Sequence, residues 1–308
     1  MKNHVLVILG PTASGKTELA CRVAVQLDAE IISADSRQIY KFMDIGTGKD
    51  LEEYTLDGIQ IPYHLIDIKD PGYRYNIAEY HEDFLRVSKE IFERNKQVIL
   101  CGGSGLYLET AIEGHSFLGI PKSSEIVEKY KHLSKQEIEN DYHEITPKLK
   151  QKLPGQTVDR MIRAIEIDSF LKANPEWEGN ESAEYSFTVV GTLIDREERR
   201  NKITKRLKQR LENGLIEEVE FLLKNYLTYE DLEYYGLEYK WVGNFLNGSI
   251  TKAELFDGLN IAIHQFAKRQ MTWFRRMEKR GIQIRWIDVD LPMEERVNQV
   301  LSFYHIKQ

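Results

Sequence analysis

The hydrophobic positions in the first third of the chain alternate between short apolar runs and stretches with helical spacing. Strands are predicted at Val5–Leu9, Glu30–Ser33, Ile59–Ile68 and Gln97–Cys101, and helices at Glu18–Leu27 and Asn76–Asn95. A crossover between parallel strands is right-handed and packs its helix back onto the sheet, so this alternation indicates a parallel sheet covered on both faces. We therefore expect an α/β fold.

The middle of the chain has a different pattern. Between His115 and Gln156 the apolar runs disappear and Lys, Glu, Gln and Asn dominate, which predicts a small helical insertion. The elements expected after it are helix Val158–Leu171, loop Lys172–Glu184, strand Phe187–Ile194, helices Arg196–Tyr226 and Lys252–Arg276, strand Ile282–Ile287 and helix Met293–Phe303. We expect a core made of residues 1–114 and 157–308, interrupted by a helical insertion domain over residues 115–156.

Composition narrows the class of protein. The 308 residues are 42% hydrophobic and 30% charged, as in an ordinary globular protein. No apolar run approaches the roughly 20 residues of a membrane helix, and the apolar stretch at the start is too short for a signal peptide. Cys21 and Cys101 lack a CxxC spacing and are expected to be reduced. We expect a cytoplasmic monomer that binds no membrane.

A phosphate-binding motif follows the first predicted strand. Gly10-Pro11-Thr12-Ala13-Ser14-Gly15-Lys16-Thr17 matches G-x-x-x-x-G-K-[ST] and opens a predicted helix, which is the context this motif requires. Its backbone N–H groups and the helix N-terminus surround phosphate oxygens, Lys16 neutralises charge, and the Thr17 hydroxyl can bind Mg²⁺. The motif predicts a polyphosphate ligand, and taken alone it favours an ATP-dependent small-molecule kinase.

Two neighbouring strand ends alter this interpretation. The run Gln97–Leu100 ends in Cys101-Gly102-Gly103-Ser104-Gly105 rather than in the Asp that usually holds Mg²⁺ in an NTPase. This turn is either a second backbone approach to the ligand, with Ser104 as a donor, or a plain tight turn. Asp35 follows another strand, where it can bind Mg²⁺, accept a proton or cap a helix. The residues alone indicate a polyphosphate-dependent transferase.

Several longer segments together resemble the tRNA dimethylallyltransferase family. In chain order they are Gly10–Thr17, Ser33–Tyr40, Asp44–Lys49, His64–Asp67, Gly102–Tyr107, Arg163–Ile167 and Ala267–Trp273. The likeness spans almost the whole chain, and it implies a P-loop NTPase-like core with the helical insertion. The implied reaction transfers a prenyl group from dimethylallyl diphosphate to the exocyclic amine of an adenosine beside a tRNA anticodon.

The resemblance also implies roles for individual residues. Asp35 accepts the amine proton, with Thr12 and Arg163 as further catalytic residues. The diphosphate is held by Gly10, Thr12, Ala13, Ser14, Gly15, Lys16, Thr17, Ser104 and Arg163, with Mg²⁺ on Thr17. The flipped adenine and the tRNA contact Ser36, Arg37, Gln38, Lys268, Arg269 and Gln270. The chain departs from the family at Ser104, which replaces Thr, at Gln156-Thr157, which replaces Asn-Asp, and at His264, which replaces Arg.

The net charge of −7 excludes a globally basic surface, so RNA binding would depend on local clusters of basic residues. The sequence contains two such clusters. They comprise Arg196, Arg199, Arg200, Lys202, Lys205, Arg206, Lys208 and Arg210, and then Lys268, Arg269, Arg275, Arg276, Lys279 and Arg280. The first is either a phosphate-binding face or a solvated helix face. Trp273 and Phe274, inside the second, either stack on bases or pack in the core. The rival functions are an adenylate isopentenyltransferase of the cytokinin type, the kinase, and a non-catalytic RNA-binding protein.

Overall fold

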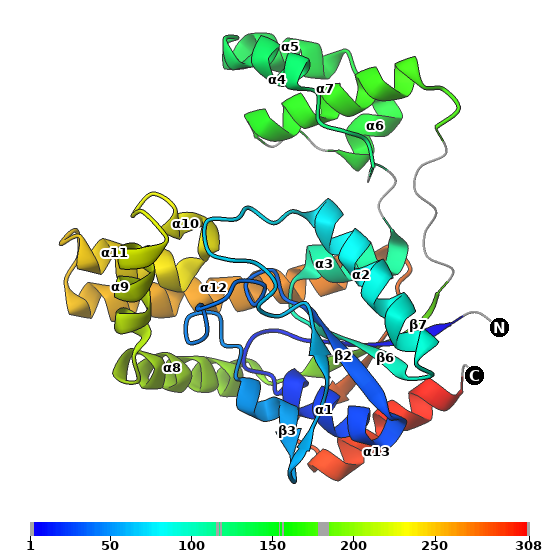
Figure 1. Cartoon of the computed structure of the whole chain (residues 1–308), viewed down its shortest axis with the longest axis vertical. Coiled ribbons are helices and arrows are strands. Elements are labelled where there is room, and N and C mark those ends of the chain that lie inside the picture. The colour runs from blue at the N-terminus through cyan, green and yellow to red at the C-terminus, as the bar shows by residue number, and fades with distance from the viewer. Residues whose placement is uncertain are drawn as a thin grey trace. The chain divides into compact units, whose positions relative to one another are not determined.

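The structure, a computed structural model, describes residues 3–114, 117, 119–153, 155, 157–177 and 185–306. It divides into two compact units (Figure 1). One comprises Met1–Glu113 with Ala183–Gln308, and the other comprises Gly114–Ser182. We refer to them as the core unit and the inserted unit.

A six-stranded parallel sheet forms the centre of the core unit, which confirms the predicted α/β class. Its order is β5-β2-β6-β1-β7-β8. The strands are β1 (His4–Leu9), β2 (Ala29–Ala34), β5 (Tyr63–His64), β6 (Gln97–Gly102), β7 (Ser186–Leu193) and β8 (Ile284–Asp288). Because β6 lies between β1 and β2, the loops that follow these three strands begin side by side.

Alternating side chains of β1 enter two hydrophobic cores, one on each face of the sheet. Leu6 and Ile8 pack with α1 (Lys16–Leu27) and α13 (Met293–His305). Val5, Val7 and Leu9 pack in the larger core with the remaining helices of this unit. Those helices are α2 (Ile77–Glu93), α3 (Gly105–Glu113), α8 (Arg196–Glu212), α9 (Leu215–Asn225), α10 (Leu232–Tyr235), α11 (Leu237–Leu246) and α12 (Lys252–Lys279).

Two predicted elements are divided in the structure. The helix expected over Arg196–Tyr226 is α8 and α9, because Gly214 between them has φ +104°, a left-handed conformation that ends a helix. The strand expected over Ile59–Ile68 is β4 (Ile59–Gln60) and β5. β4 pairs only with β3 (Thr55–Leu56), which follows the 3₁₀ helix η1 (Leu51–Tyr54). Pro62 separates β4 from β5, because proline has no N–H to donate to a ladder.

The inserted unit is larger than the insertion predicted over residues 115–156. Its helices are α4 (Ser124–Lys131), α5 (Lys135–His143), α6 (Pro147–Lys152) and α7 (Val158–Ala173). α7, which the sequence pattern assigns to the core, packs against α4, α5 and α6 and contributes Met161, Ala164 and Ile165 to their common hydrophobic core. Gln156 and most of the predicted loop Lys172–Glu184 lie outside the described residues.

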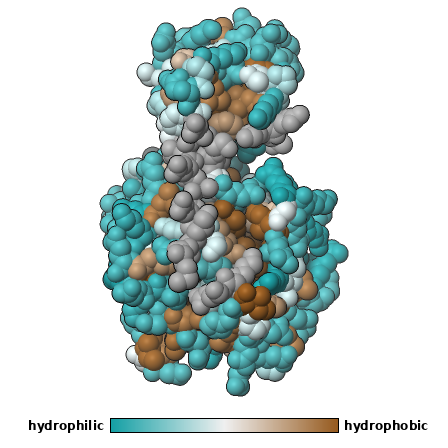
Figure 2. Space-filling model, turned by 90° about the vertical axis from the view of Figure 1, so that its right-hand side faces the viewer, coloured by the Kyte–Doolittle hydropathy of each residue, from teal (hydrophilic) through white to brown (hydrophobic). Residues whose placement is uncertain are grey.

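The surface agrees with the composition. No helix in the described part of the chain is long and apolar enough to cross a membrane. On the face drawn in Figure 2, hydrophilic residues predominate and the apolar ones form scattered patches.

One buried carboxylate links β2 to the edge strand β5 and to the end of α2. Glu30 of β2 accepts hydrogen bonds from Arg94 Nη2 (2.7 Å) and Nε (3.2 Å), and its Oε2 lies 2.6 Å from His64 Nε2 on β5. Burial alone would raise the pKa of Glu30, but the hydrogen bonds from Arg94 and His64 outweigh it and lower that pKa. Glu30 is therefore more easily ionised in the folded than in the unfolded chain.

We expect Glu30→Gln to lower the free energy of unfolding at pH 7, because it removes the negative charge that pairs with Arg94. The loss should be only about 1–2 kcal/mol, since Arg94 is half exposed and solvent weakens the pair. Because the pKa of Glu30 is lower in the folded chain, its charge stabilises the fold fully at pH values above the ordinary Glu pKa of 4.5. This stabilisation is lost as the pH falls through the folded-state pKa. Urea unfolding at pH 7, 5 and 4 should show the difference shrinking. Asp28→Asn, in an exposed pair with Lys96, is the control with little expected effect. A loss for Glu30→Gln that is independent of pH would contradict this account.

Candidate functional site

The loops that follow β1 and β2 line a cavity of about 450 Å³ in the core unit. Leu9 of β1 and Ala34 of β2 both pair with Gly102 of β6, so the three strands end in register. The loops beginning at Gly10, Asp35 and Gly103 therefore meet at one edge of the sheet. Open α/β sheets place their ligands at this edge.

The phosphate-binding motif has the conformation of an anion-binding loop. Ala13 and Gly15 have φ of +64° and +70°, and α1 begins at Lys16. Backbone with such alternating conformations points successive N–H groups into a concavity that binds anions. The Ser14 hydroxyl is buried: it donates to Pro11 O (2.9 Å) and lies 2.7 Å from Thr192 Oγ1. This leaves the Ser14 N–H, rather than its hydroxyl, as the group available to a phosphate.

Gln270 of α12 joins the phosphate loop to the turn after β6. Its Oε1 accepts from the Thr12 N–H (2.9 Å), and its Nε2 donates to Gly103 O (2.9 Å). A Cβ at Gly103 would lie 2.4 Å from Gln270 Nε2, so this approach requires glycine. Since both ends of the amide are bound within the protein, the contacts favour Gln270 as a positioning residue for the loop. Its predicted contact with adenine or tRNA stays a prediction.

Arg206 of α8 adds a cation that the motif did not predict. Its Nη2 donates to Thr12 Oγ1. Burial, followed by the neighbouring charge of Arg210, lowers the pKa of Arg206 to about 10, and Asp50 partly opposes this effect. The sequence indicates only that Arg206 belongs to a general basic cluster, although it adjoins the buried apolar positions Ile203 and Leu207 of the same helix. The place of Arg206 beside these apolar residues is the sequence signal that indicates an inward-pointing side chain.

Asp35 lies at the cavity beside the turn that contains Ser104. Its Oδ1 accepts from the Arg37 N–H (2.9 Å), while the Arg37 guanidinium donates to Tyr234 O. Ser104 Oγ accepts from the Ser36 N–H (3.0 Å). Asp35 and Arg37 line the cavity with the phosphate loop, whereas Ser104 binds the loop that carries Asp35. The predicted contact of Ser104 with diphosphate remains untested.

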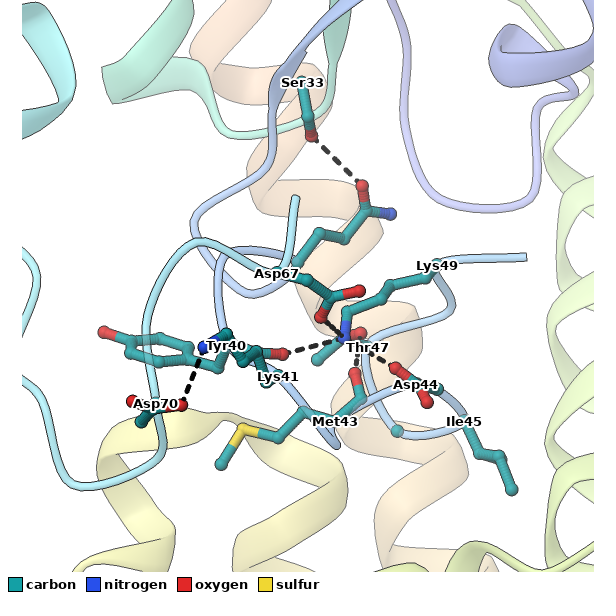
Figure 3. Close-up of polar contacts among 12 residues, drawn as sticks. Ser33, Tyr40, Lys41, Met43, Asp44, Ile45, Thr47, Lys49, Asp67 and Asp70 are labelled. Atoms are coloured by element: carbon teal, nitrogen blue, oxygen red, sulfur yellow. Dashed lines mark hydrogen bonds and ion pairs between the residues drawn. The ribbon is translucent and has the colours of Figure 1, made fainter. Parts of the chain in front are cut away.

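A buried lysine holds the loop that forms one wall of the cavity (Figure 3). Lys49 Nζ donates to Tyr40 O (2.7 Å), to Asp44 Oδ1 (2.6 Å) and to Asp67. Gln38, on the same loop, accepts from Ser33 Oγ (3.0 Å) and donates to the backbone of this wall. The contacts of the segment Asp44–Lys49 therefore indicate a structural role.

A carboxylate from α9 fixes the same loop from the other side. Glu218 accepts from the backbone N–H groups of Asp44 (2.8 Å), Ile45 (2.7 Å) and Gly46 (3.0 Å), and from the hydroxyl of Tyr239 (2.9 Å). Four donors on one carboxylate give a rigid anchor. The wall is thus held independently of any ligand.

The two basic clusters are each divided by the fold. A groove of about 430 Å³ between α8 and α12 contains cations from both, together with a half-buried His264 whose pKa is lowered by burial and by Arg200 and Arg199. The cations lining it are Arg196, Arg199, Arg200, Lys268 and Arg275. No carboxylate of the described residues forms an ion pair with Lys268 or Arg269.

The C-terminal end of the second cluster is neutralised. Arg276 (3.0 Å) and Arg280 form ion pairs with Glu109, which also accepts from Trp273 Nε1 (2.8 Å). Phe274 is fully buried in the larger core. For both aromatic residues the contacts thus favour packing within the protein over stacking on bases.

Comparison with known proteins decides the family. A family model described as IPP transferase matches residues 38–277. The chain belongs to the IPP transferase family. This confirms the resemblance found in the sequence.

Relatives of this family match nearly the whole chain. It is 50% identical over 296 residues to tRNA dimethylallyltransferase 2 of Bacteroides fragilis, covering 96% of each protein. The crystal structure of the full-length tRNA isopentenylpyrophosphate transferase from Bacillus halodurans is 30% identical, with a TM-score of 0.72 over 99% of this chain and 98% of that one. A eukaryotic dimethylallyltransferase structure, 22% identical, has a TM-score of 0.78 over 93% of this chain and 74% of its own, and shows the shared fold.

Arg163 is the predicted site residue that belongs to the inserted unit. It donates to Glu166 Oε2 (3.1 Å), to Ile120 O (2.6 Å) and to Pro121 O (3.2 Å), all in that unit. The other predicted IPP transferase site residues belong to the core unit. The role of Arg163 toward the diphosphate stays a prediction.

We expect Gln270→Leu to weaken binding of inorganic pyrophosphate by about tenfold, since it leaves the Thr12 N–H and Gly103 O unpaired and loosens the loop. Isothermal titration calorimetry measures this affinity directly. Gln265→Leu, an exposed position on the same helix, is the control with unchanged pyrophosphate affinity. Loss of RNA affinity with unchanged pyrophosphate binding would instead make Gln270 an RNA contact.

Proposed function

We propose that the protein transfers the dimethylallyl group of dimethylallyl diphosphate to the N6 amine of an adenosine adjacent to the anticodon in tRNA, releasing diphosphate. One observation carries the chemistry: a single cavity contains a phosphate-binding loop, the cations Lys16 and Arg206, and the carboxylate of Asp35. A diphosphate leaving group and a proton acceptor are the two requirements of an amine prenylation. The 50% identity to a tRNA dimethylallyltransferase supports the same reaction.

The cations act on the leaving group. As the bond between the allylic carbon and the diphosphate oxygen breaks, negative charge develops on that oxygen. The loop N–H groups, Lys16 and Arg206 are positioned beforehand to stabilise this charge in a partly buried cavity. Arg206 and Thr12 are hydrogen-bonded, so they bind the diphosphate as a unit.

Mg²⁺ fits the residues at this position. A P-loop Mg²⁺ is held by one hydroxyl, phosphate oxygens and water, so it needs no cage of protein carboxylates. Thr17 lines the cavity and would supply the hydroxyl. When bound, the ion would neutralise diphosphate charge.

Asp35 serves as the general base. Its Oδ1 is oriented by the Arg37 N–H, which leaves the other oxygen to take the proton from N6 as the new C–N bond forms. Ser36, Arg37 and Gln38 surround the adenine, which must leave its stack to reach the cavity. The groove between α8 and α12 positions the RNA backbone by its phosphates.

We expect label to pass from dimethylallyl diphosphate to an anticodon stem-loop RNA containing unmodified adenosine, in the presence of Mg²⁺. Parallel reactions with AMP and with ATP test the adenylate-transferase alternative. Asp35→Asn should lower kcat by about 10²–10⁴-fold while RNA affinity stays within a few-fold, because it removes the base and keeps the shape.

Transfer to AMP in place of RNA would overturn the proposed acceptor. An equal loss of RNA affinity and turnover in Asp35→Asn would overturn its role as base. The matched control is Asp57→Asn, a loop position that does not line the cavity, which should keep full activity.

We expect Lys268→Gln combined with Arg269→Gln to weaken RNA binding and to reduce the slope of log K against log salt. The reduction should be about 0.7–0.9 for each phosphate that the variant no longer neutralises. Both side chains are exposed and free of ion pairs with the described carboxylates. Lys224→Gln, an exposed cation on α9, controls for net charge. An unchanged slope in the double variant, measured by fluorescence anisotropy from 50 to 300 mM salt, would remove these two residues from the interface.

A further inference from the structure

Two arginines at the edge of the cavity share one carboxylate. Asp50 Oδ2 lies 3.5 Å from Arg210 Nη2 and 3.9 Å from Arg206 Nη1. Arg206 and Arg210 are one turn apart on α8, so their guanidinium groups point the same way. Asp50 is about half exposed, whereas only 12% of the Arg210 side chain is exposed.

Arg210 keeps hydrogen-bonding capacity that its contact with Asp50 does not use. Arg210 Nη2 is buried and has no hydrogen-bond partner among the described residues. Glu238 and Glu53 also line the cavity, and burial raises the pKa of both carboxyl groups. Among the described carboxylates, Asp50 is the one within ion-pair distance of Arg206 and Arg210.

The loop that forms the cavity wall fixes Arg210 in place. A Cβ at Gly48 would lie 2.0 Å from Arg210 Nη2, so the guanidinium packs directly on the backbone there. Gly48 belongs to the loop that Lys49 and Glu218 hold rigid. Arg210 is thus a preorganised donor and cannot withdraw from the cavity without moving this wall.

We propose that Arg210 extends the anion site by a second phosphate position, and that the Asp50 carboxylate competes with that phosphate for Arg206 and Arg210. This inference rests on the proposed function, whose donor and product each carry two linked phosphates. Arg210 then selects a diphosphate over a monophosphate. Asp50 limits how tightly the released diphosphate is held.

The physical basis is exchange of one anion for another. A guanidinium binds phosphate and carboxylate with the same fork of N–H groups, so one displaces the other at little cost in hydrogen bonds. A phosphate that bridges the two arginines must also overcome repulsion from Asp50. Removing the Asp50 charge therefore strengthens diphosphate binding, but only while Arg210 is present.

The first arm of the test is Arg210→Met, which keeps the apolar stem and removes the guanidinium. Calorimetry with inorganic pyrophosphate and with orthophosphate compares the two anions. We expect pyrophosphate affinity to fall about tenfold or more and orthophosphate affinity to change by less than about threefold. Lys208→Met removes a charge from an exposed position on the same helix and should stay within about twofold for both. Equal losses for both anions in Arg210→Met would overturn the second phosphate position.

The second arm is Asp50→Asn. We expect it to bind pyrophosphate about five- to tenfold more tightly, and to show a correspondingly lower inhibition constant for pyrophosphate as product. In the double variant with Arg210→Met this gain should fall below about twofold. Weaker or unchanged pyrophosphate binding in Asp50→Asn, with an unaltered thermal unfolding temperature, would overturn the competition.

Label transfer by the wild-type protein separates this inference from the proposed function. Pyrophosphate binding is measured without turnover, so the two can fail independently. The predicted binding pattern without transfer to RNA would reject the transferase and keep the anion site. Transfer without the binding pattern would reject the roles of Arg210 and Asp50 alone.

Discussion

The site depends on keeping several cations close together in a partly buried cavity. A guanidinium removed from water is costly unless an anion faces it, and the lowered pKa of Arg206 reflects that cost. The same cost favours binding of a multiply charged ligand, because the ligand relieves it. The surrounding structure must therefore prevent the cations from moving apart. Lys49 and Glu218, each with several strong hydrogen bonds, hold the loop against which Arg210 packs.

The acidic groups are distributed in agreement with this constraint. Three carboxylates beside the cavity wall bind groups other than the arginines: Glu218 binds backbone N–H groups, and Asp44 and Asp67 bind Lys49. Glu109 similarly pairs with Arg276 on another part of α12. An acidic chain can thus present local basic surface, since net charge says nothing about where charges are placed.

Local signals predicted the sheet, the phosphate loop and Asp35, because each depends on neighbouring residues: apolar runs, glycine spacing and a strand end. The contacts of Arg206 and Gln270 with Thr12 escaped prediction, because they join residues far apart in the sequence. The family resemblance places Gln270 at the site as a contact of adenine or tRNA, which stays a prediction. The strand expected over Ile59–Ile68 failed for a local reason, since Pro62 interrupts it and Leu65 and Asp67 have positive φ.

The turn after β6 is linked through Gln270 to the phosphate loop and directly contacts the loop that carries Asp35. The sequence left it as either a second approach to the ligand or a tight turn. Gly103 O accepts from Gln270, which also binds the phosphate loop, while Ser104 binds the loop that carries Asp35. A shift of this turn would displace the phosphate loop and the loop that carries Asp35 together. The distance between these two loops is therefore set by β6 and α12, which are rigid elements.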